Sequence, residues 1–373
     1  MKNKVSNIIF LILVTSIIIF FSLSYLLFPQ RLFSEDENRV LQTLPQFNFN
    51  KLLDGTYTRQ LHNYFSDQII FRTEMIEIKA ITELLMLKNE NNGILLGKDE
   101  YLIEIHLYNK DNYAYLSKNL NKIEKLMEKF EEEGITANSA IVPRKVDILK
   151  DYFPEYYSDS RNKAVWNLIN NKHFSLTQAL SKAQNQGENV FYKTDHHWTA
   201  DGAYCAYKCL GNALNYTPYD WEHFEIKTLS SHFHGTTYSK SGFLFINFEE
   251  IKAPSVKKGK YRVSIVDTNT EFDALYDESY LNKKDKYSLF LSGNNAHVKI
   301  YDTENKTKET LLIVKDSFSH ALAPFLCEHF NLELIDPRYY NGSIEEYVKE
   351  NNIKCVLFLF GLDTLASANI GIR

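Results

Sequence analysis

Residues 310–326 read TLLIVKDSFSHALAPFL, an apolar run followed by the polar group KDS and then by a second, largely apolar stretch. Residues 310–314 predict a buried strand and residues 319–330 a helix, which Pro324 is placed to kink. Strand, helix and strand follow at residues 332–335, 344–350 and 355–360. Nearly continuous apolar strands that alternate with helices indicate a parallel sheet with helices on both faces. The fold class is therefore α/β.

The same alternation is present upstream. Residues 115–133 have a helical period, and residues 137–142 predict the buried strand that follows. Residues 59–88 predict one amphipathic helix, or two helices with a break near Ser66-Asp67, and residues 93–103 predict a hairpin. Between about residues 222 and 307, short alternating segments separated by polar turns predict a β-rich insertion in the same domain.

The N-terminus predicts a membrane anchor. Residues 7–28 carry no charge and match the ~20 residues that a helix needs to cross a bilayer. A signal peptide would have a shorter apolar core followed by small residues, so an uncleaved anchor is favoured. Lys2 and Lys4 precede the span, and the positive-inside rule then makes residues 1–6 a cytoplasmic tail. Residues 29–55 become a linker, and residues 56–373 an extracytoplasmic domain.

The composition narrows the class of partner. A net charge of −5 argues against nucleic acid or an anionic lipid surface as the main partner. The 4 cysteines form no CxxC pair, so neither a disulfide framework nor a cysteine metal site is indicated. The exported body is long enough to bury a substantial core.

Ser317 is the first candidate for chemistry. It follows a predicted strand and precedes a predicted helix, so it lies at the carboxyl edge of the sheet, where α/β proteins place their ligands. Backbone N–H groups at a helix N-terminus can stabilise a developing oxyanion. The alternative is that Asp316 or Ser317 only caps the helix. A GxSxG motif is absent from the sequence, which counts against an ordinary α/β-hydrolase.

Asp195-His196-His197-Trp198 forms a second loop of this kind. It follows a predicted strand at residues 189–192 and precedes a predicted helix that begins near Thr199 and runs to residue 213. A carboxylate and an imidazole from this loop would complete, with the Ser317 hydroxyl, the groups of nucleophilic acyl chemistry. Spacing alone does not choose between the two histidines, and a solvated histidine pair is the alternative.

A metal site is the competing interpretation of this loop. His232 and His234 supply two more imidazoles and Asp195 an oxygen, which are ligand types of zinc and iron sites. The sequence contains no HExxH motif, so we favour acyl chemistry without a metal or other cofactor.

Seven motifs together resemble a known family. They are TDHHWTADGAY (194–204), VKDSFSH (314–320), SDQIIFR (66–72), GILLGKDEYLI (93–103), VPRK (142–145), GTTYSKSG (235–242) and DPRYY (336–340). With the N-terminal membrane helix, the chain resembles the DHHW family of bacterial surface proteins, which are SGNH-hydrolase-like and related to the alginate O-acetyltransferase subunits. The resemblance implies an SGNH-hydrolase-like (flavodoxin-like) fold. It also implies Asp195 as the orienting acid, His197 as the general base and Ser317 as the nucleophile.

The resemblance implies a membrane-anchored O-acetyltransferase at the bacterial cell membrane. An acetyl-enzyme at Ser317 would pass its acetyl group to a hydroxyl of a cell-surface polysaccharide, and a multi-pass membrane O-acyltransferase would supply that group. A carbohydrate acetylesterase with the same three residues is one alternative. A non-catalytic envelope protein that binds a glycan or a partner is the other.

Five further residues are candidates for contacting substrate. Arg338 follows a strand end and could bind an acyl group or a glycan carboxylate, although an ion pair with Asp336 or Asp316 is an equal alternative. The others are Tyr238 and Lys240 in the GTTYSKSG loop, and His196 and Trp198 beside the expected base.

Overall fold

The structure is a computed structural model that describes residues 2–34, 39–155, 157 and 163–373. Its internal contacts divide the chain into two units. The N-terminal unit runs to Asn91 and includes Ser239–Leu244, and the second unit holds Asn92–Tyr238 and Phe245–Arg373. This division lies further along the chain than the boundary at residue 55 expected from the sequence, and the predicted domain limits remain a prediction.

The N-terminal unit is mainly helical. Its elements are α1 (Lys2–Leu27), β1 (Phe33–Ser34), β2 (Arg39–Val40), α2 (Phe49–Leu53), α3 (Thr56–Gln68), α4 (Arg72–Leu85) and β3 (Glu90–Asn91). Within α1, Lys4–Leu27 has a mean hydropathy of 2.6 and is long and apolar enough to cross a membrane. The structure contains the helix pair that was one of the two predictions for residues 59–88. The break falls after Gln68 and ends at Phe71, whose φ of 59° is left-handed and cannot continue a helix.

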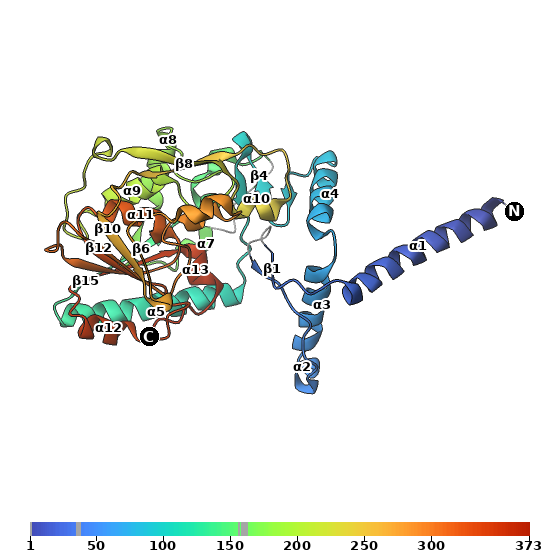
Figure 1. The fold of residues 1–373 in the computed structure, drawn as a ribbon, viewed down its shortest axis with the longest axis horizontal. Helices are drawn as coiled ribbons and strands as arrows, with labels where there is room; N and C mark the ends of the chain where they lie inside the picture. The colour runs from blue at the N-terminus through green and yellow to red at the C-terminus, as the bar shows by residue number, and fades with distance from the viewer. Residues whose placement is uncertain (1, 35–38, 156, 158–162) are drawn as a thin grey trace. The chain divides into compact units, whose positions relative to one another are not determined.

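The second unit is built on an eight-stranded sheet (Figure 1). Its strands in spatial order are β11 (Thr270–Phe272), β10 (Tyr261–Ile265), β12 (His297–Asp302), β14 (Asn331–Ile335), β13 (Thr310–Lys315), β15 (Cys355–Gly361), β6 (Thr136–Val142) and β7 (Phe174–Ser175). The five from β14 to β7 are parallel. The parallel sheet expected from the apolar runs is therefore present, and it forms the part of the sheet that carries the site.

The remaining three strands come from the predicted β-rich insertion. β12, β10 and β11 extend it in antiparallel pairing, so the sheet is mixed. Part of the predicted β-rich insertion thus continues the main sheet, because a short turn lets β10 and β11 pair as a hairpin with no helical crossover. Separate hairpins are formed by β8 (Ile226–Phe233) with β9 (Glu249–Pro254) and, as predicted, by β4 (Ile94–Leu96) with β5 (Leu102–Glu104).

Helices cover both faces of the sheet (Figure 1). One face packs against α5 (Lys110–Glu132), α7 (Lys163–Trp166), α12 (Ile344–Glu350) and α13 (Leu362–Ser367). The other packs against α6 (Lys145–Ile148), α8 (Thr177–Asn185), α9 (Ala200–Leu210) and α11 (Phe318–Leu326). Along β13, Leu311 and Ile313 enter one core, while Leu312 and Val314 enter the other. Burial on both faces explains why this strand is apolar throughout.

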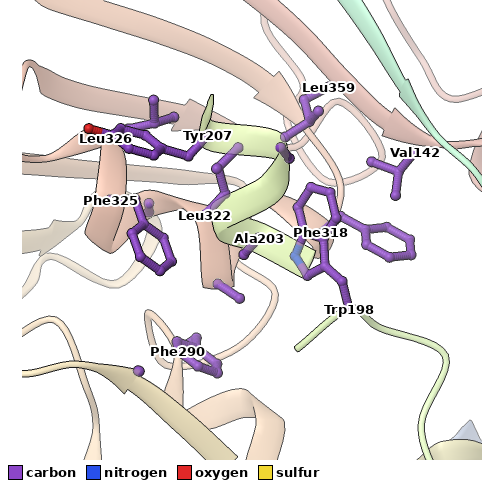
Figure 2. Packing of buried hydrophobic residues seen from close by; sticks show 14 of the residues in the cluster. Val142, Trp198, Ala203, Tyr207, Phe290, Phe318, Leu322, Phe325, Leu326 and Leu359 are labelled. Carbon is purple, nitrogen blue, oxygen red and sulfur yellow. The ribbon is translucent and has the colours of Figure 1, made fainter. Parts of the chain in front are cut away.

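The helix after β13 is shorter than predicted. It begins at Phe318 and ends at Leu326, whereas the sequence pattern suggested residues 319–330. Pro324 lies near its end and removes one main-chain donor. All nine residues of α11 are buried, and Figure 2 shows Phe318, Leu322 and Phe325 among the aromatic and aliphatic side chains of the core. The start of α11 is thus held rigidly by packing.

The loop of Asp195-His196-His197-Trp198 is a tight turn whose approach is not a strand. The strand predicted at residues 189–192 is not formed. This segment makes only an isolated bridge between Phe191 and Trp198. Residues 190–192 are apolar and buried in the core, and the segment folds back on itself: the Tyr192 N–H donates to His197 O at 3.2 Å. Thr199 then caps α9, as predicted, by accepting from Gly202 N at 3.3 Å.

Candidate active site

The structure brings together three residues that the sequence places in two distant loops. Ser317 Oγ lies 2.7 Å from His197 Nε2, and His197 Nδ1 lies 2.5 Å from Asp195 Oδ1. The carboxylate accepts the Nδ1–H, so Nε2 is left as the acceptor that can take the proton of the serine hydroxyl. We call Asp195, His197 and Ser317 the triad.

The serine hydroxyl is available because a neighbour performs the capping role. Ser317 occupies the N-cap position of α11, yet its side chain makes no capping hydrogen bond. Asp316 instead accepts from Phe318 N at 3.1 Å and from Gly361 N at 2.7 Å. The alternative that Ser317 only caps the helix therefore does not describe this loop. In the described part of the chain the Ser317 N–H has no hydrogen-bond acceptor, as an oxyanion donor requires.

Asp195 is buried and its oxygens are fully engaged. Besides the imidazole, Oδ1 accepts from His197 N at 2.9 Å, and Oδ2 accepts from Thr236 N at 2.7 Å and from the Thr236 hydroxyl at 3.0 Å. Burial alone would raise the pKa of the Asp195 carboxyl, but His196, His197 and these hydrogen bonds hold that pKa well below its usual value. The carboxylate therefore stays ionised.

A glycine leaves room for this carboxylate. A Cβ on Gly235 would lie 2.2 Å from Asp195 Cβ and 2.3 Å from its Oδ2, closer than atoms can approach. The GTTYSKSG motif, which begins at Gly235, thus contributes to the site through its backbone and through Thr236. From the sequence we expected this motif to contribute Tyr238 and Lys240 instead.

Tyr287 fixes the plane of the base and was not predicted. Its ring stacks on that of His197 with centroids 3.8 Å apart and an interplanar angle of 7°. The Tyr287 hydroxyl donates to Ser317 O at 3.4 Å, so this side chain touches both the base and the residue of the nucleophile. It comes from a short turn 30 residues before Ser317, and nothing in its local sequence marks it.

The buried Lys145 and the half-buried Glu249 support the loop before Asp195. Glu249 accepts from Lys193 N at 2.8 Å and from Thr194 N at 2.7 Å. Lys145, from the VPRK motif, donates to Leu102 O at 2.7 Å and to Lys193 O at 3.1 Å. Burial lowers the pKa of the Lys145 ammonium to about 8. These residues join β5, the start of α6 and β9 to the triad loop.

Trp198 was predicted to contact substrate, but the structure buries it in the core. Its side chain has no exposed surface and packs edge-on against Phe318 at a centroid distance of 5.3 Å (Figure 2). It is a core residue that joins the two loops of the triad. His196, by contrast, keeps 42% of its side chain exposed beside the base. The Thr236 hydroxyl donates to Asp195, so His196 Nδ1 must donate to that hydroxyl at 2.8 Å.

The other three candidates have different surroundings. Arg338 makes a bidentate pair with Asp336, at 2.9 Å through Nε and 2.6 Å through Nη2, which is the structural alternative considered for it. Tyr238 lies on α10 (Thr236–Ser241), and its ring stacks on His234 at 3.7 Å. Lys240 is exposed near the end of α10 and counts with the N-terminal unit.

The atoms that a metal would need are used by hydrogen bonds. Ligand atoms of Asp195, His196 and His197 lie within 4.8 Å of one another. Both nitrogens of His197 and both oxygens of Asp195 are already bound within the protein, as described above. His234 Nε2 contacts Ile246 O at 3.1 Å, and the exposed His232 contacts Ser231. The donor set therefore fits proton transfer better than metal binding.

Part of the chain matches a known family of domains. Residues 94–245 match the family described as SGNH hydrolase-like domain, acetyltransferase AlgX. Over these residues the chain is similar to the SGNH hydrolase-like acetyltransferases. The matched range contains Asp195 and His197, and Ser317 lies beyond it.

Curated relatives are bacterial O-acetylases. The chain is 25% identical over 176 residues to a probable alginate O-acetylase AlgJ of Pseudomonas fluorescens, with 44% of each chain covered. It is 25% identical over 181 residues to the corresponding protein of Pseudomonas syringae, again with 44% of each covered. The chain thus spans less than half the length of these relatives. Their named activity belongs to the class of enzyme expected from the sequence.

Solved structures show the same fold. A DHHW family protein from Eubacterium siraeum has a TM-score of 0.60 and 23% identity, and covers 75% of this chain and 94% of its own. Bacillus cereus PatB1 has a TM-score of 0.61 and 19% identity, and covers 75% of this chain and 99% of its own. The predicted resemblance to DHHW proteins and the SGNH-like α/β fold are therefore confirmed.

Proposed function

We propose that this chain is an O-acetyltransferase that carries an acetyl group on Ser317 and passes it to a sugar hydroxyl. The hydrogen-bonded chain from Asp195 through His197 to Ser317 is the observation that carries this proposal. The named activity of the AlgJ relatives supports the acetyl group as cargo and a polysaccharide as acceptor.

In the first step, His197 Nε2 takes the proton of Ser317 as Oγ attacks the carbonyl carbon of an acetyl donor. The Ser317 N–H, at the start of α11, is suited to stabilise the oxyanion of the tetrahedral intermediate. His197 then gives the proton to the leaving group, and an acetyl ester remains on Ser317. Asp195 holds the imidazole in the required tautomer and stabilises its protonated form.

The second step repeats the first with the acceptor in place of the donor. His197 removes the proton of the acceptor hydroxyl, the acceptor oxygen attacks the acetyl carbonyl, and Ser317 Oγ leaves with the proton. Water in place of the sugar would make the protein an acetylesterase. The same triad serves both reactions, so the acceptor decides the outcome.

The location of the enzyme is part of the proposal. The length and hydropathy of α1 support a single-pass membrane anchor, and Lys4 before the apolar run supports a cytoplasmic N-terminus. The triad would then work outside the bacterial cell membrane on a cell-surface polysaccharide. Because acetyl donors are made in the cytoplasm, a multi-pass membrane acyltransferase would have to supply the acetyl group.

The test uses the full chain in detergent, with 4-nitrophenyl acetate as donor and an oligosaccharide as acceptor. Acetylation of Ser317 in intact protein and release of nitrophenol are measured for the native chain and for Ser317→Ala. We expect Ser317→Ala to lose about a thousand-fold or more in rate. Ser319→Ala is the matched control, because among the residues that the structure describes the Ser319 hydroxyl bonds only to Asp316 O, at 2.9 Å.

Three outcomes separate the possibilities. Transfer to the sugar that depends on Ser317 supports an acetyltransferase. Acetate release that no acceptor alters indicates an esterase. If the native chain and Ser317→Ala react equally slowly, the triad has no catalytic role, and a non-catalytic envelope protein becomes the better description.

A further inference from the structure

Lys315 is a buried cation two residues before the nucleophile. Only 1% of its side chain is exposed. Side chains alternate along a strand, so Lys315 continues the row of Leu311 and Ile313, which lies on the face of β13 that α11 covers. Burying an ammonium is costly unless the protein pairs it. The steps written above for the triad do not use this residue, so its place beside the nucleophile needs a reason.

The Lys315 ammonium is held against the first turn of α11. Its Nζ donates to Nε2 of His320 at 2.7 Å, and His320 is the third residue of that helix and is 2% exposed. In the same turn, His320 N donates to Ser317 O at 3.2 Å. Side chains of a helix lean toward its N-terminus, so the ammonium lies beside the turn that begins at the nucleophile. The contact between Lys315 and His320 therefore closes a ring of the chain that contains Ser317.

His320 serves this contact as a neutral acceptor. An ammonium has donors only, so Nε2 of His320 carries no proton. Burial and the charge of Lys315 hold the pKa of His320 well below its usual value. Burial also lowers the pKa of the Lys315 ammonium to about 8, so most of it is charged at neutral pH. The pair thus carries a single positive charge.

Two carboxylates and a second cation lie near Lys315. Asp336, which follows the neighbouring strand β14, has its Oδ2 3.8 Å from Lys315 Nζ and is bound in bidentate fashion by Arg338. Asp316 adjoins the nucleophile and is 1% exposed. In this group of four, the two cations match the two carboxylates. Removal of the Lys315 charge would leave an excess of negative charge where an oxyanion has to form.

We propose that Lys315 is a positioning residue for the oxyanion formed in the reaction at Ser317. Anchored on His320, its ammonium fixes the first turn of α11 and offsets the neighbouring carboxylates. The inference rests on the proposed function and adds a residue to it. As Ser317 Oγ bonds to the acetyl carbon, its proton passes to His197 and the carbonyl electron pair moves onto the oxygen. This negative charge exists only after the attack begins, so Lys315 should speed acetylation without tightening donor binding.

The test compares the reaction with a ligand that mimics its intermediate. The full chain reacts with 4-nitrophenyl acetate, and the nitrophenol burst gives the rate constant for acetylation of Ser317 and the donor concentration that half-saturates it. Methylboronic acid is then bound, because its adduct with a serine oxygen is a tetrahedral anion. We expect Lys315→Met to lower the burst rate constant and the affinity for methylboronic acid about ten-fold or more each, and to leave half-saturation within about three-fold.

Further variants separate the charge from the contact. Lys315→Gln keeps a donor but loses the charge, so it should be as slow as Lys315→Met. His320→Leu removes the acceptor and should also slow the burst, whereas His320→Gln keeps an acceptor and should be about three-fold faster than His320→Leu, or more.

Lys308→Met is the matched control. The Lys308 side chain is 9% exposed, its Nζ lies 2.6 Å from Asp302 Oδ2, and it precedes β13 at the end of the strand opposite to Lys315. Its loss leaves a buried carboxylate without that cation, so the melting temperature should fall. The burst rate constant should keep its native value.

The two proposals fail in different ways. If the native chain is never acetylated on Ser317, the proposed function fails and the role of Lys315 with it. If the native chain is acetylated and a folded Lys315→Met or Lys315→Gln protein has the native burst rate constant, only the role of Lys315 is overturned. A change confined to half-saturation, or a native affinity for methylboronic acid, overturns it as well. Melting temperatures identify the folded variants, and if one Lys315 variant does not fold, the other decides.

Discussion

Substitution of Gly235 by alanine tests whether the position of Asp195 governs the chemistry. The added Cβ would lie 2.3 Å from Asp195 Oδ2, and an ordinary carbon–oxygen contact is about 1 Å longer. The carboxylate must therefore move by about 1 Å, a displacement that can cost about a hundred-fold in rate. The upper bound is the loss of about ten-thousand-fold that follows removal of the orienting acid in a serine triad.

The measurement is kcat/KM for 4-nitrophenyl acetate, together with the melting temperature. Overpacking of this kind costs about 1–3 kcal/mol of stability. For a unit of this size that lowers the melting temperature by about 2–4 °C per kcal/mol, so the variant should still be folded when assayed.

Gly342→Ala is the control, because its Cβ would meet the ring of Tyr340, a half-exposed side chain that can turn aside. It should keep native activity. A folded Gly235→Ala protein whose kcat/KM stays within about three-fold of the native value would refute the reasoning.

Three further predictions follow from the surroundings of the triad. Tyr287→Leu should lower kcat/KM about two- to ten-fold by removing the ring that stacks on His197, whereas Tyr287→Phe should retain most of the activity. Folding lowers the pKa of Asp195, so its stabilising contribution is present above its unfolded pKa of about 3.9 and is lost as the pH falls through the folded value. The melting temperatures of the native chain and Asp195→Asn should therefore converge on acidification, and a constant difference would contradict this. Lys145→Met should destabilise the protein by about 1–3 kcal/mol in chemical denaturation, because the buried ammonium no longer donates to Leu102 O or to Lys193 O, the second of which still accepts from Leu102 N; an unchanged midpoint would show that water replaces the ammonium.

The sequence predicts the parallel part of the sheet well because a strand that is buried on both faces is a continuous apolar run in the sequence. β13 is apolar at consecutive positions since both of its faces are covered, and a strand of this kind can be recognised without knowing its neighbours. In the predicted strand at residues 189–192, residues 190–192 are also apolar, but they are buried as a folded-back loop. An apolar run predicts that a segment is buried, but it does not predict that its backbone pairs with another strand. The strand predicted there was therefore wrong.

The site was predictable to the extent that its residues share a motif. Asp195 and the two histidines are adjacent in sequence, and family resemblance selected His197, which is the histidine that contacts Ser317. Tyr287 and Gly235 could not be found in this way, because each matters through one contact with a residue that is distant in the chain. Trp198 was assigned to the substrate since it adjoins the base, but neighbours in a tight turn can point into opposite environments.

The order of the strands has a consequence for how the protein acquires its fold. The central strands β13, β14 and β15 are the last three in the chain, and β6 pairs with β15 from Thr136↔Cys355 to Val142↔Gly361. A growing chain therefore presents β6 and its apolar faces long before their partner exists. Contacts of such high sequence separation make folding slow and leave intermediates prone to aggregation. Loss of even the last twenty or so residues would remove the strand that joins the two parts of the parallel sheet, so a protein truncated there should not fold.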